Sequence, residues 1–205
     1  DNKNVGSAKV VTLVSNYAGV DTGNYSITDQ TSTSADVTAK SLNISGVVAT
    51  DKVYDGNAVA NIDVTAAVFS GLVAGDDLSV AITGVFDSKN VGTNKVVTLS
   101  NSYSGTDTTN YSISDQSSIT ADVTAKSLSV SGITASDKVY DGNTEAAVDV
   151  TSAAYAGLVA GDDLSITATG TFDNKNVGTA KVVSLSGSYA GADTGNYNIT
   201  DQAST

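Results

Sequence analysis

The heptapeptide Asp-Lys-Val-Tyr-Asp-Gly-Asn groups several side chains that could do chemistry, and it occurs twice, at residues 51–57 and 137–143. Carboxylate and amide oxygens are ligands that Ca²⁺ prefers, and the sequence Gly-Asp-Asp follows each copy. A calcium site is therefore one hypothesis for this region. Its candidate ligands are Asp51, Asp55, Asn57, Asp76 and Asp77 in the first copy, and Asp137, Asp141, Asn143, Asp162 and Asp163 in the second.

A tight turn is the interpretation that the same residues favour. Asp-Gly is a strong turn dipeptide, because glycine accepts a positive φ and Asp bonds its own backbone. Asn57 and Asn143 could stabilise the exit from the turn, and Tyr54 and Tyr140 could lay their rings on an apolar core. The spacing also lacks the 12-residue loop, ending in Glu, of an EF-hand. We therefore assign no metal ligand and expect no cofactor, with calcium as the alternative.

The composition removes most kinds of catalysis. The chain has no Cys and no His, so thiolate and imidazole chemistry are both absent. Lys95 and Lys181, each followed by Val-Val, could form a Lys–Asn cross-link if a carboxyl group and an Asn lay beside them. No pattern singles out a nucleophile with its base. We assign no catalytic residue and expect that the protein is not an enzyme.

The charge of the chain limits its partners. The net charge is −12, from 22 acidic and 10 basic residues. A nucleic-acid binder needs a basic face that displaces counterions, so nucleic acid is not an expected partner. No run of roughly 18 apolar residues is present, and we expect no membrane insertion in this segment. The absence of Met predicts that the chain is a piece of a longer protein.

The chain is built from a repeat of 86 residues, the difference between positions 51 and 137. The same offset separates Ala-Asp-Val-Thr-Ala-Lys-Ser-Leu at 35–42 from its copy at 121–128. Residues 34–119 and 120–205 align without a gap, with 57 identities among the 86 pairs. This period is too long for one coil of a solenoid and suits a small domain with its own core.

Short runs in which apolar and polar side chains alternate are typical of strands with one buried face. Gly, Asn and Asp mark turns between these runs, and Glu is almost absent, so helices are not expected. We expect six or seven strands in each repeat, in antiparallel sheets that pack face to face. The clearest runs are 42–44, 62–68, 78–82, 97–99 and 111–113.

A change in the phase of the alternation predicts where one repeat ends. Apolar positions are odd-numbered up to Val123 and Ala125, and even-numbered from Leu128 onward. Such a change reverses the buried face, and the connection has no Gly or Pro, which favours a short, stiff link. The predicted domains are the C-terminal part of a repeat at 1–39, a complete repeat at 40–125 and a nearly complete repeat at 126–205.

Three motifs resemble the YDG-type repeats of very large bacterial surface proteins, which occur beside filamentous-haemagglutinin-like secreted adhesins. The motifs are Lys-x-Tyr-Asp-Gly, Asn-Val-Gly and Asp-x-x-Asn-Tyr, the last at residues 107–111 and 193–197. The resemblance covers the whole chain, repeat by repeat. It implies an all-β protein of tandem immunoglobulin-like β-sandwich domains of about 86 residues each, and it carries over no catalytic site.

Two classes of function are consistent with these features. The first is a structural stalk or fibre repeat of an extracellular bacterial adhesin or biofilm-matrix protein, acting as a stiff spacer. The alternative is a glycan- or protein-binding repeat that acts by avidity through the loop at 71–77, or a filament subunit that assembles by strand exchange. The expected partners are neighbouring repeats and, in a fibre, like chains. The expected location is the bacterial cell surface or a secreted matrix.

Overall fold

The computed structural model describes residues 1–205, and its regular structure is almost entirely β-strand. Its helices are three 3₁₀ turns, η1 (Thr22–Asn24), η2 (Thr108–Asn110) and η3 (Thr194–Asn196). The predicted all-β class is therefore confirmed. None of these helices has the length and apolar character that crossing a membrane would require.

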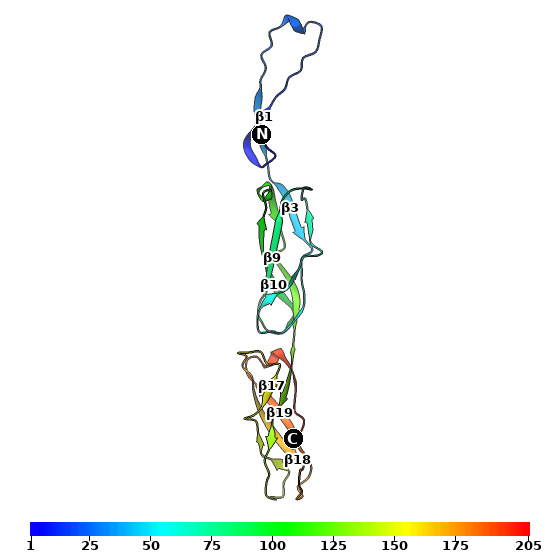
Figure 1. The fold of residues 1–205 in the computed structure, drawn as a ribbon, viewed down its shortest axis with the longest axis vertical. Coiled ribbons are helices and arrows are strands. Elements are labelled where there is room, and N and C mark those ends of the chain that lie inside the picture. The colour runs from blue at the N-terminus through cyan, green and yellow to red at the C-terminus, as the bar shows by residue number, and fades with distance from the viewer. The chain divides into compact units, whose positions relative to one another are not determined.

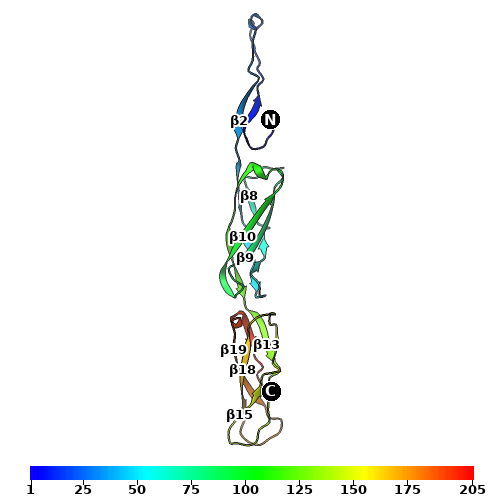
Figure 2. The ribbon, with the colours of Figure 1, turned by 90° about the vertical axis from the view of Figure 1, so that its left-hand side faces the viewer.

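The chain divides into two compact units (Figures 1 and 2). Unit 1 comprises Asp1–Val47, Asp63–Thr83 and Leu99–Ser117. Unit 2 comprises Val48–Ile62, Gly84–Thr98 and Ser118–Thr205. The C-terminal repeat therefore lies wholly in unit 2, whereas the repeat before it contributes residues to both units.

Unit 1 contains a hairpin and a three-stranded sheet. Strands β1 and β2 pair antiparallel, with a bulge between Gly6 and Lys9, and β3 lies between β8 and β11. The core of the unit consists of Leu42 and Ile44 from β3 with Tyr111 from β11, all buried. The strands are β1 (Gly6–Thr12), β2 (Ser32–Val37), β3 (Lys40–Ser45), β8 (Val68–Ser70) and β11 (Tyr111–Ser114).

Three strands contain residues of both units, namely β7 (Ile62–Asp63), β9 (Ser79–Phe86) and β10 (Gly92–Ser104). Strands β9 and β10 belong to a five-stranded sheet of order β5-β12-β10-β9-β6. The other members of this sheet are β5 (Lys52–Val53), β6 (Val59–Ala60) and β12 (Ser118–Thr124).

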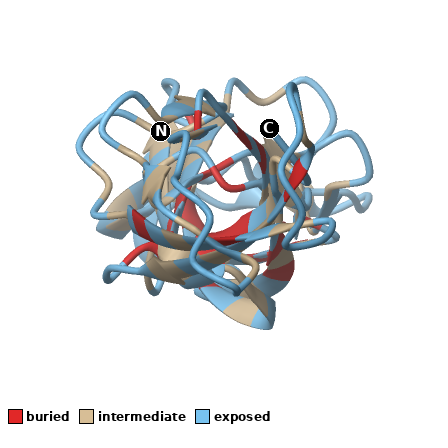
Figure 3. Ribbon diagram, turned by 90° about the horizontal axis from the view of Figure 1, so that it is seen from below, coloured by how far each residue is buried: buried red, intermediate tan, exposed pale blue.

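The C-terminal repeat folds as three small sheets in unit 2, of order β17-β13-β20, β15-β18-β19 and β14-β16. Val130 from β13 and Ile166 from β18 are buried in one cluster, so two of these sheets share a core. Figure 3 shows buried residues on the strands and mostly exposed residues in the loops. The remaining strands are β4 (Val48–Ala49), β13 (Lys126–Ser131), β14 (Thr134–Ala135), β15 (Glu145–Ala146), β16 (Val148–Asp149), β17 (Ala154–Ala156), β18 (Ser165–Phe172), β19 (Val183–Ala190) and β20 (Tyr197–Thr200).

The sheets are mixed, which corrects the prediction of purely antiparallel pairing. Strand β13 pairs antiparallel with β17 but parallel with β20, in the register Lys126↔Tyr197 and Leu128↔Ile199. Strand β3 pairs parallel with β11 in the same way. Alternation of side chains reports which face is buried and carries no information on strand direction, so the sequence could not reveal the parallel pairs.

The strand predicted at 62–68 is also wrong. It is interrupted by a turn, in which Ala67 N donates to Val64 O at 3.0 Å, and Val64 and Val68 are exposed. Asp63 accepts a hydrogen bond from the backbone of Thr65, a local bond that competes with strand pairing. Alternating residue types alone did not distinguish this turn from a strand.

The predicted change of buried face near Lys126 is confirmed at most positions. Ala121 and Val123 are buried before it, and Leu128 and Val130 after it. Strand β12 ends at Thr124 and β13 begins at Lys126, so the two strands are separated by Ala125 alone. Ala125 itself is exposed, contrary to prediction, because it lies in this connection rather than in a strand.

Gly170 in β18 tests how closely the C-terminal repeat is packed. A Cβ at this position would lie 2.6 Å from Val148 Cγ1 and 2.8 Å from Val183 Cγ1, well inside contact distance. We expect Gly170→Ala to lower the free energy of unfolding by about 1–3 kcal/mol, the usual effect of overpacking. Urea denaturation measures the change.

Gly195→Ala is the matched control for this substitution. A Cβ at Gly195 meets no atom within 4 Å, and the preceding repeat carries Thr109 at the corresponding position. We expect a change of less than about 0.5 kcal/mol. Equal effects of the two substitutions would contradict the packing described here.

Candidate functional site

The repeated heptapeptide forms the predicted turn in both copies. Gly56 and Gly142 have φ values of 83° and 85°, a region that favours glycine. Asp55 Oδ1 accepts the backbone N–H of Asn57 at 3.1 Å, and Asn57 Oδ1 accepts that of Val59 at 2.9 Å. The Asp side chain thus closes the turn and the Asn side chain stabilises its exit, as the sequence predicted.

The two copies of the heptapeptide differ in the environment of their tyrosine. Tyr54 is 1% exposed, whereas Tyr140 is 57% exposed, so the predicted packing of the ring on a core is confirmed for Tyr54 and wrong for Tyr140. The ring of Tyr54 packs edge-on against the ring of Tyr197, which belongs to the next repeat, with centroids 5.6 Å apart. The local sequence is the same in both copies, so contacts outside the heptapeptide account for the burial of Tyr54: the ring of Tyr197 in the following repeat, and Thr124 and Lys89 in its own repeat.

Asp162 is the acceptor at the centre of this contact. Its side chain is 3% exposed. The hydroxyl of Tyr54 donates to both carboxylate oxygens, at 3.0 and 2.9 Å, and the hydroxyl of Tyr197 donates at 2.5 Å. One carboxylate of the C-terminal repeat therefore receives a tyrosine from its own repeat and a tyrosine from the repeat before it.

Lys89 supplies the charge that pairs with this carboxylate. Its Nζ lies 3.1 Å from Asp162 Oδ1 and 2.8 Å from Asp193 Oδ1, and it lies over the ring of Tyr54. The residues after Lys89 continue the contact. The backbone N–H of Val91 donates to Asn196 Oδ1 at 3.0 Å.

The same arrangement occurs in unit 1, displaced by 86 residues in sequence. Lys3 Nζ lies 2.8 Å from Asp76 Oδ1 and 2.9 Å from Asp107 Oδ1. The N–H of Val5 donates to Asn110 Oδ1 at 2.9 Å, and the hydroxyl of Tyr111 donates to Asp76 at 2.6 Å. We call each arrangement a junction. Its donor segment is Lys-Asn-Val, and its acceptor side chains come from the Gly-Asp-Asp and Asp-x-x-Asn-Tyr motifs.

The acceptor motifs are held in place by bonds of their own. Asp193 Oδ2 accepts the backbone N–H of Asp163 at 3.0 Å, and Asp107 does the same for Asp77. Asn196 Nδ2 donates to Asp193 Oδ1 at 3.3 Å. These bonds tie the two loops of the acceptor together and hold the carboxylates in place.

The ionisation of the junction follows from these contacts. Burial alone would raise the pKa of Asp162, but hydrogen bonds from Tyr197, Lys89 and Tyr54 hold it below its ordinary value. Hydrogen bonds with Asp193, Tyr54 and Asp162 raise the pKa of Lys89. Burial and the bond to Asp162 raise the pKa of Tyr197 to about 12. At neutral pH the carboxylate and the ammonium group are therefore charged and the hydroxyls are protonated.

Stability should fall at both ends of the pH scale. Between about pH 10 and 12 the unfolded chain loses the Tyr197 proton that the folded chain keeps, so the folded state is favoured less as pH rises. The lowered pKa of Asp162 contributes stability that is lost below about pH 4. We expect the urea midpoint to decrease between about pH 10 and 12. The decrease should be smaller in Tyr197→Phe, and an identical decrease would contradict the assignment.

The candidate calcium ligands are not gathered into a metal site. No group of three or more acidic side chains in the structure is arranged to hold a metal ion. Asp55 and Asp141 pair with the lysines of their own turns, and Asp76 and Asp162 pair with the junction lysines. Asp51 accepts the backbone N–H of Asp122, and Asn57 and Asn143 bond their own turns. Asp77 and Asp163 bond the acceptor loops, and Asp137 lies in a groove at the surface.

The lysines proposed for a cross-link are ion-paired. Lys181 Nζ lies 2.9 Å from Asp173 and 2.8 Å from Asn174 Oδ1, so a carboxyl group and an Asn do lie beside it. The hydrogen bond from Lys181 holds the pKa of Asp173 below its ordinary value. The carboxyl group beside Lys181 is therefore an ion-pair partner of the amine in this structure. Lys95 pairs with Asp87 and Ser88 and has no Asn at this position.

The loop at 71–77, proposed as a binding surface, is part of the junction. The N–H of Val73 donates to the hydroxyl of Tyr111 at 3.0 Å, and Asp76 pairs with Lys3. The sequence singles out Asn-Val-Gly as a recurring motif but does not show that it meets the acceptor motifs. The sequence does contain a signal for this pairing. Lys3, Lys89 and Lys175 recur every 86 residues, and the acceptor aspartates recur with the same period.

The fold and the junctions define a class of protein, that of all-β tandem repeats whose successive copies contact one another through recurring polar residues. The YDG domain family model matches residues 38–119 and again 124–205. These two matches cover most of the chain, which therefore belongs to the YDG domain family. No curated protein and no solved structure matches the chain.

Proposed function

We propose that this chain is a segment of the stalk or fibre of an extracellular bacterial surface or matrix protein, in which the repeats act as a stiff spacer. In this proposal each repeat is an immunoglobulin-like β-sandwich. The extracellular setting is supported by the resemblance to repeats found beside filamentous-haemagglutinin-like adhesins. The strongly acidic charge is suited to a surface protein whose copies should repel one another.

The observation that carries the proposal is the recurrence of the junction. Lys3 and Lys89 make the same two ion pairs, and Val5 and Val91 make the same backbone bond, at positions 86 residues apart. Contacts that recur at the same residues define one geometry for every pair of neighbours. A spacer needs this property, because its length should depend on the number of repeats.

The buried side chains and ion pairs of the junction would oppose bending between neighbouring repeats. A flexible linker would leave the ends of the repeats solvated, whereas here Tyr54 and Asp162 are almost fully buried. Bending the junction would expose the tyrosine ring and separate charge-assisted hydrogen bonds, which are stronger than neutral ones. The link at Ala125 is also a single residue between two strands.

The proposal predicts how length depends on repeat number. Chains with one and with two added copies of residues 120–205 should show equal increments of maximum dimension in small-angle X-ray scattering. Each increment should approach the diameter of one compact domain, on the order of 30–40 Å. Increments that shrink as copies are added would indicate folding back and would overturn the spacer proposal.

A further inference from the structure

The composition of the chain leaves tyrosine as the side chain that an oxidant attacks first. Cys, Met, Trp and His are all absent, whereas the chain has 9 Tyr. Cys and Met are the residues that oxidants commonly modify, and here they cannot compete. Oxidation of a phenol releases a proton together with the electron. A tyrosine whose hydroxyl already donates to a carboxylate is therefore the favoured place for this step.

Tyr54 and Tyr197 meet this condition at the junction of unit 2. Both hydroxyls donate to the same oxygen, Asp162 Oδ2, at 2.9 and 2.5 Å. Although burial opposes the charge, the hydrogen bonds to Asp162 hold its pKa below the ordinary value. The carboxylate is therefore charged at neutral pH and can accept a proton from either phenol. Lys89 Nζ, 3.1 Å from Asp162 Oδ1, balances its charge.

The rings of the same two tyrosines are in contact. Their centroids are 5.6 Å apart and the rings are inclined by 78°, so the edge of one ring faces the other. Because both hydroxyls donate to one oxygen, the ring carbons beside the hydroxyls, the Cε atoms, lie at the same end of the contact. Those carbons share the unpaired electron of a tyrosyl radical. Both side chains are buried, which keeps the tyrosines of other chains away from them.

We propose that the junction is a site of oxidative cross-linking, at which Tyr54 and Tyr197 are joined as dityrosine. A one-electron oxidant, such as a peroxide-driven peroxidase, removes one electron from each phenol. Each hydroxyl gives its proton to Asp162, which passes it to water. The two radicals pair to form one bond between a Cε atom of each ring. The hydrogen on each joined carbon then moves to the oxygen and restores the hydroxyl. The chain loses two hydrogen atoms, and the oxidant gains two electrons.

The cross-link would fasten two neighbouring repeats covalently. Tyr54 belongs to one repeat and Tyr197 to the next, so the new bond closes a long loop of the chain. Such a bond stabilises the folded state mainly by constraining the unfolded chain, as a disulfide does. The cross-link depends on the contact between the two tyrosines and not on a spacer role, so the scattering and oxidation experiments can fail independently.

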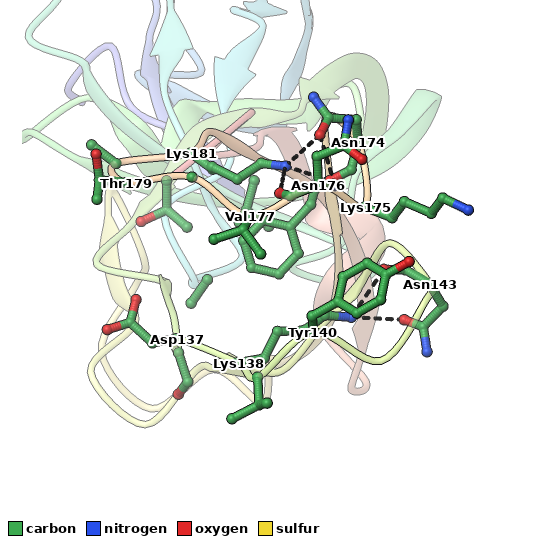
Figure 4. Close-up of a pocket in the computed structure, with 18 residues that line it drawn as sticks. Asp137, Lys138, Tyr140, Asn143, Asn174, Lys175, Asn176, Val177, Thr179 and Lys181 are labelled. Carbon is green, nitrogen blue, oxygen red and sulfur yellow. Dashed lines mark hydrogen bonds between the residues drawn. The ribbon is translucent and has the colours of Figure 1, made fainter.

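Two other tyrosines of the chain lack one or both of these features and serve as internal comparisons. Tyr111 donates to Asp76 at 2.6 Å, but its ring packs on no second tyrosine. Tyr140 lines an open groove of about 590 Å³ together with Lys138 and Asn143, and its hydroxyl donates to no carboxylate (Figure 4). We expect neither tyrosine to form a link within the chain.

Photo-oxidation of the dilute full chain with a ruthenium tris-bipyridyl complex and persulfate tests the proposal. The product should be a monomer that is lighter by two hydrogen atoms and shows dityrosine fluorescence. Cleavage after lysine should leave the fragment 53–89 joined to the fragment 182–205. Tyr197→Phe should abolish this product. Tyr189→Phe, which lies in the same fragment, and Tyr140→Phe should leave it unchanged.

Two further measurements decide the outcome without relying on the folding of a variant. The same oxidation in concentrated urea should lose the linked pair of fragments, because the two tyrosines no longer meet. The linked monomer, once purified, should have a higher urea midpoint than the unlinked chain. Oxidation of other tyrosines while the fragments 53–89 and 182–205 stay separate would overturn the proposal. Equal linking of these fragments in urea would overturn it as well.

Discussion

Tyr54→Ala should lower the free energy of unfolding of this chain by about 3–5 kcal/mol, the usual range for removing a buried aromatic side chain. Tyr54 is 1% exposed, packs against Tyr197 and donates to Asp162. The substitution leaves a cavity at the junction and removes one of the donors to a buried carboxylate. Urea denaturation of the full chain, followed by tyrosine fluorescence, measures the change.

Tyr140→Ala is the matched control, because the same heptapeptide surrounds both tyrosines. Tyr140 is 57% exposed, so we expect a change within about 0.5 kcal/mol. The difference between the two effects separates the contribution of the contacts outside the turn from that of the turn itself. Equal losses would mean that the tyrosine acts within its own turn, and the junction described here would be wrong.

Asp162→Ala should have an effect of similar size. Two tyrosine hydroxyls donate to this carboxylate, and hydrogen bonds to charged groups contribute about 1.5–3 kcal/mol each. Their loss leaves the hydroxyl of Tyr54 without its acceptor in a buried site. We expect the free energy of unfolding to fall by at least about 3 kcal/mol. The contribution of Lys89 is smaller because its side chain is 37% exposed.

Asp76→Ala provides the comparison for Asp162→Ala in unit 1. Asp76 accepts from Tyr111 and pairs with Lys3, whose side chain is 64% exposed, but no heptapeptide tyrosine reaches it. We therefore expect a smaller destabilisation than that of Asp162→Ala. A larger one would show that the tyrosine of the preceding repeat contributes little to the junction.

The parts of the fold that the sequence predicted are those that depend on local patterns. Alternation located β3 and the buried Val97 and Leu99, and the Asp-Gly dipeptide located both turns. The same reasoning failed at 62–68, where a local hydrogen bond of Asp63 overrides the alternation. Parallel pairing of β13 with β20 joins residues far apart in sequence, and side-chain alternation does not encode it.

The junction could be predicted only in part, for a related reason. Repetition singled out Lys89, Asp162 and Asp193 as positions that recur, yet it gave no indication that they meet. Acidic residues close in sequence suggested calcium, whereas the structure pairs each junction aspartate with a lysine from the preceding repeat. The sequence does not show which end of one repeat meets which end of the next. Only the tertiary structure shows that the lysine segment of one repeat lies against the acceptor loops of the following repeat.

The central claim is that the contact between neighbouring repeats buries the tyrosine of the heptapeptide. Nitration of the native chain with tetranitromethane, followed by cleavage after lysine and mass spectrometry, tests it most directly. The two tyrosines fall in different fragments, which begin at Val53 and Val139. The account predicts that Tyr140 is modified readily while Tyr54 is protected until the chain is unfolded. Modification of both at the same rate in the native chain would contradict it.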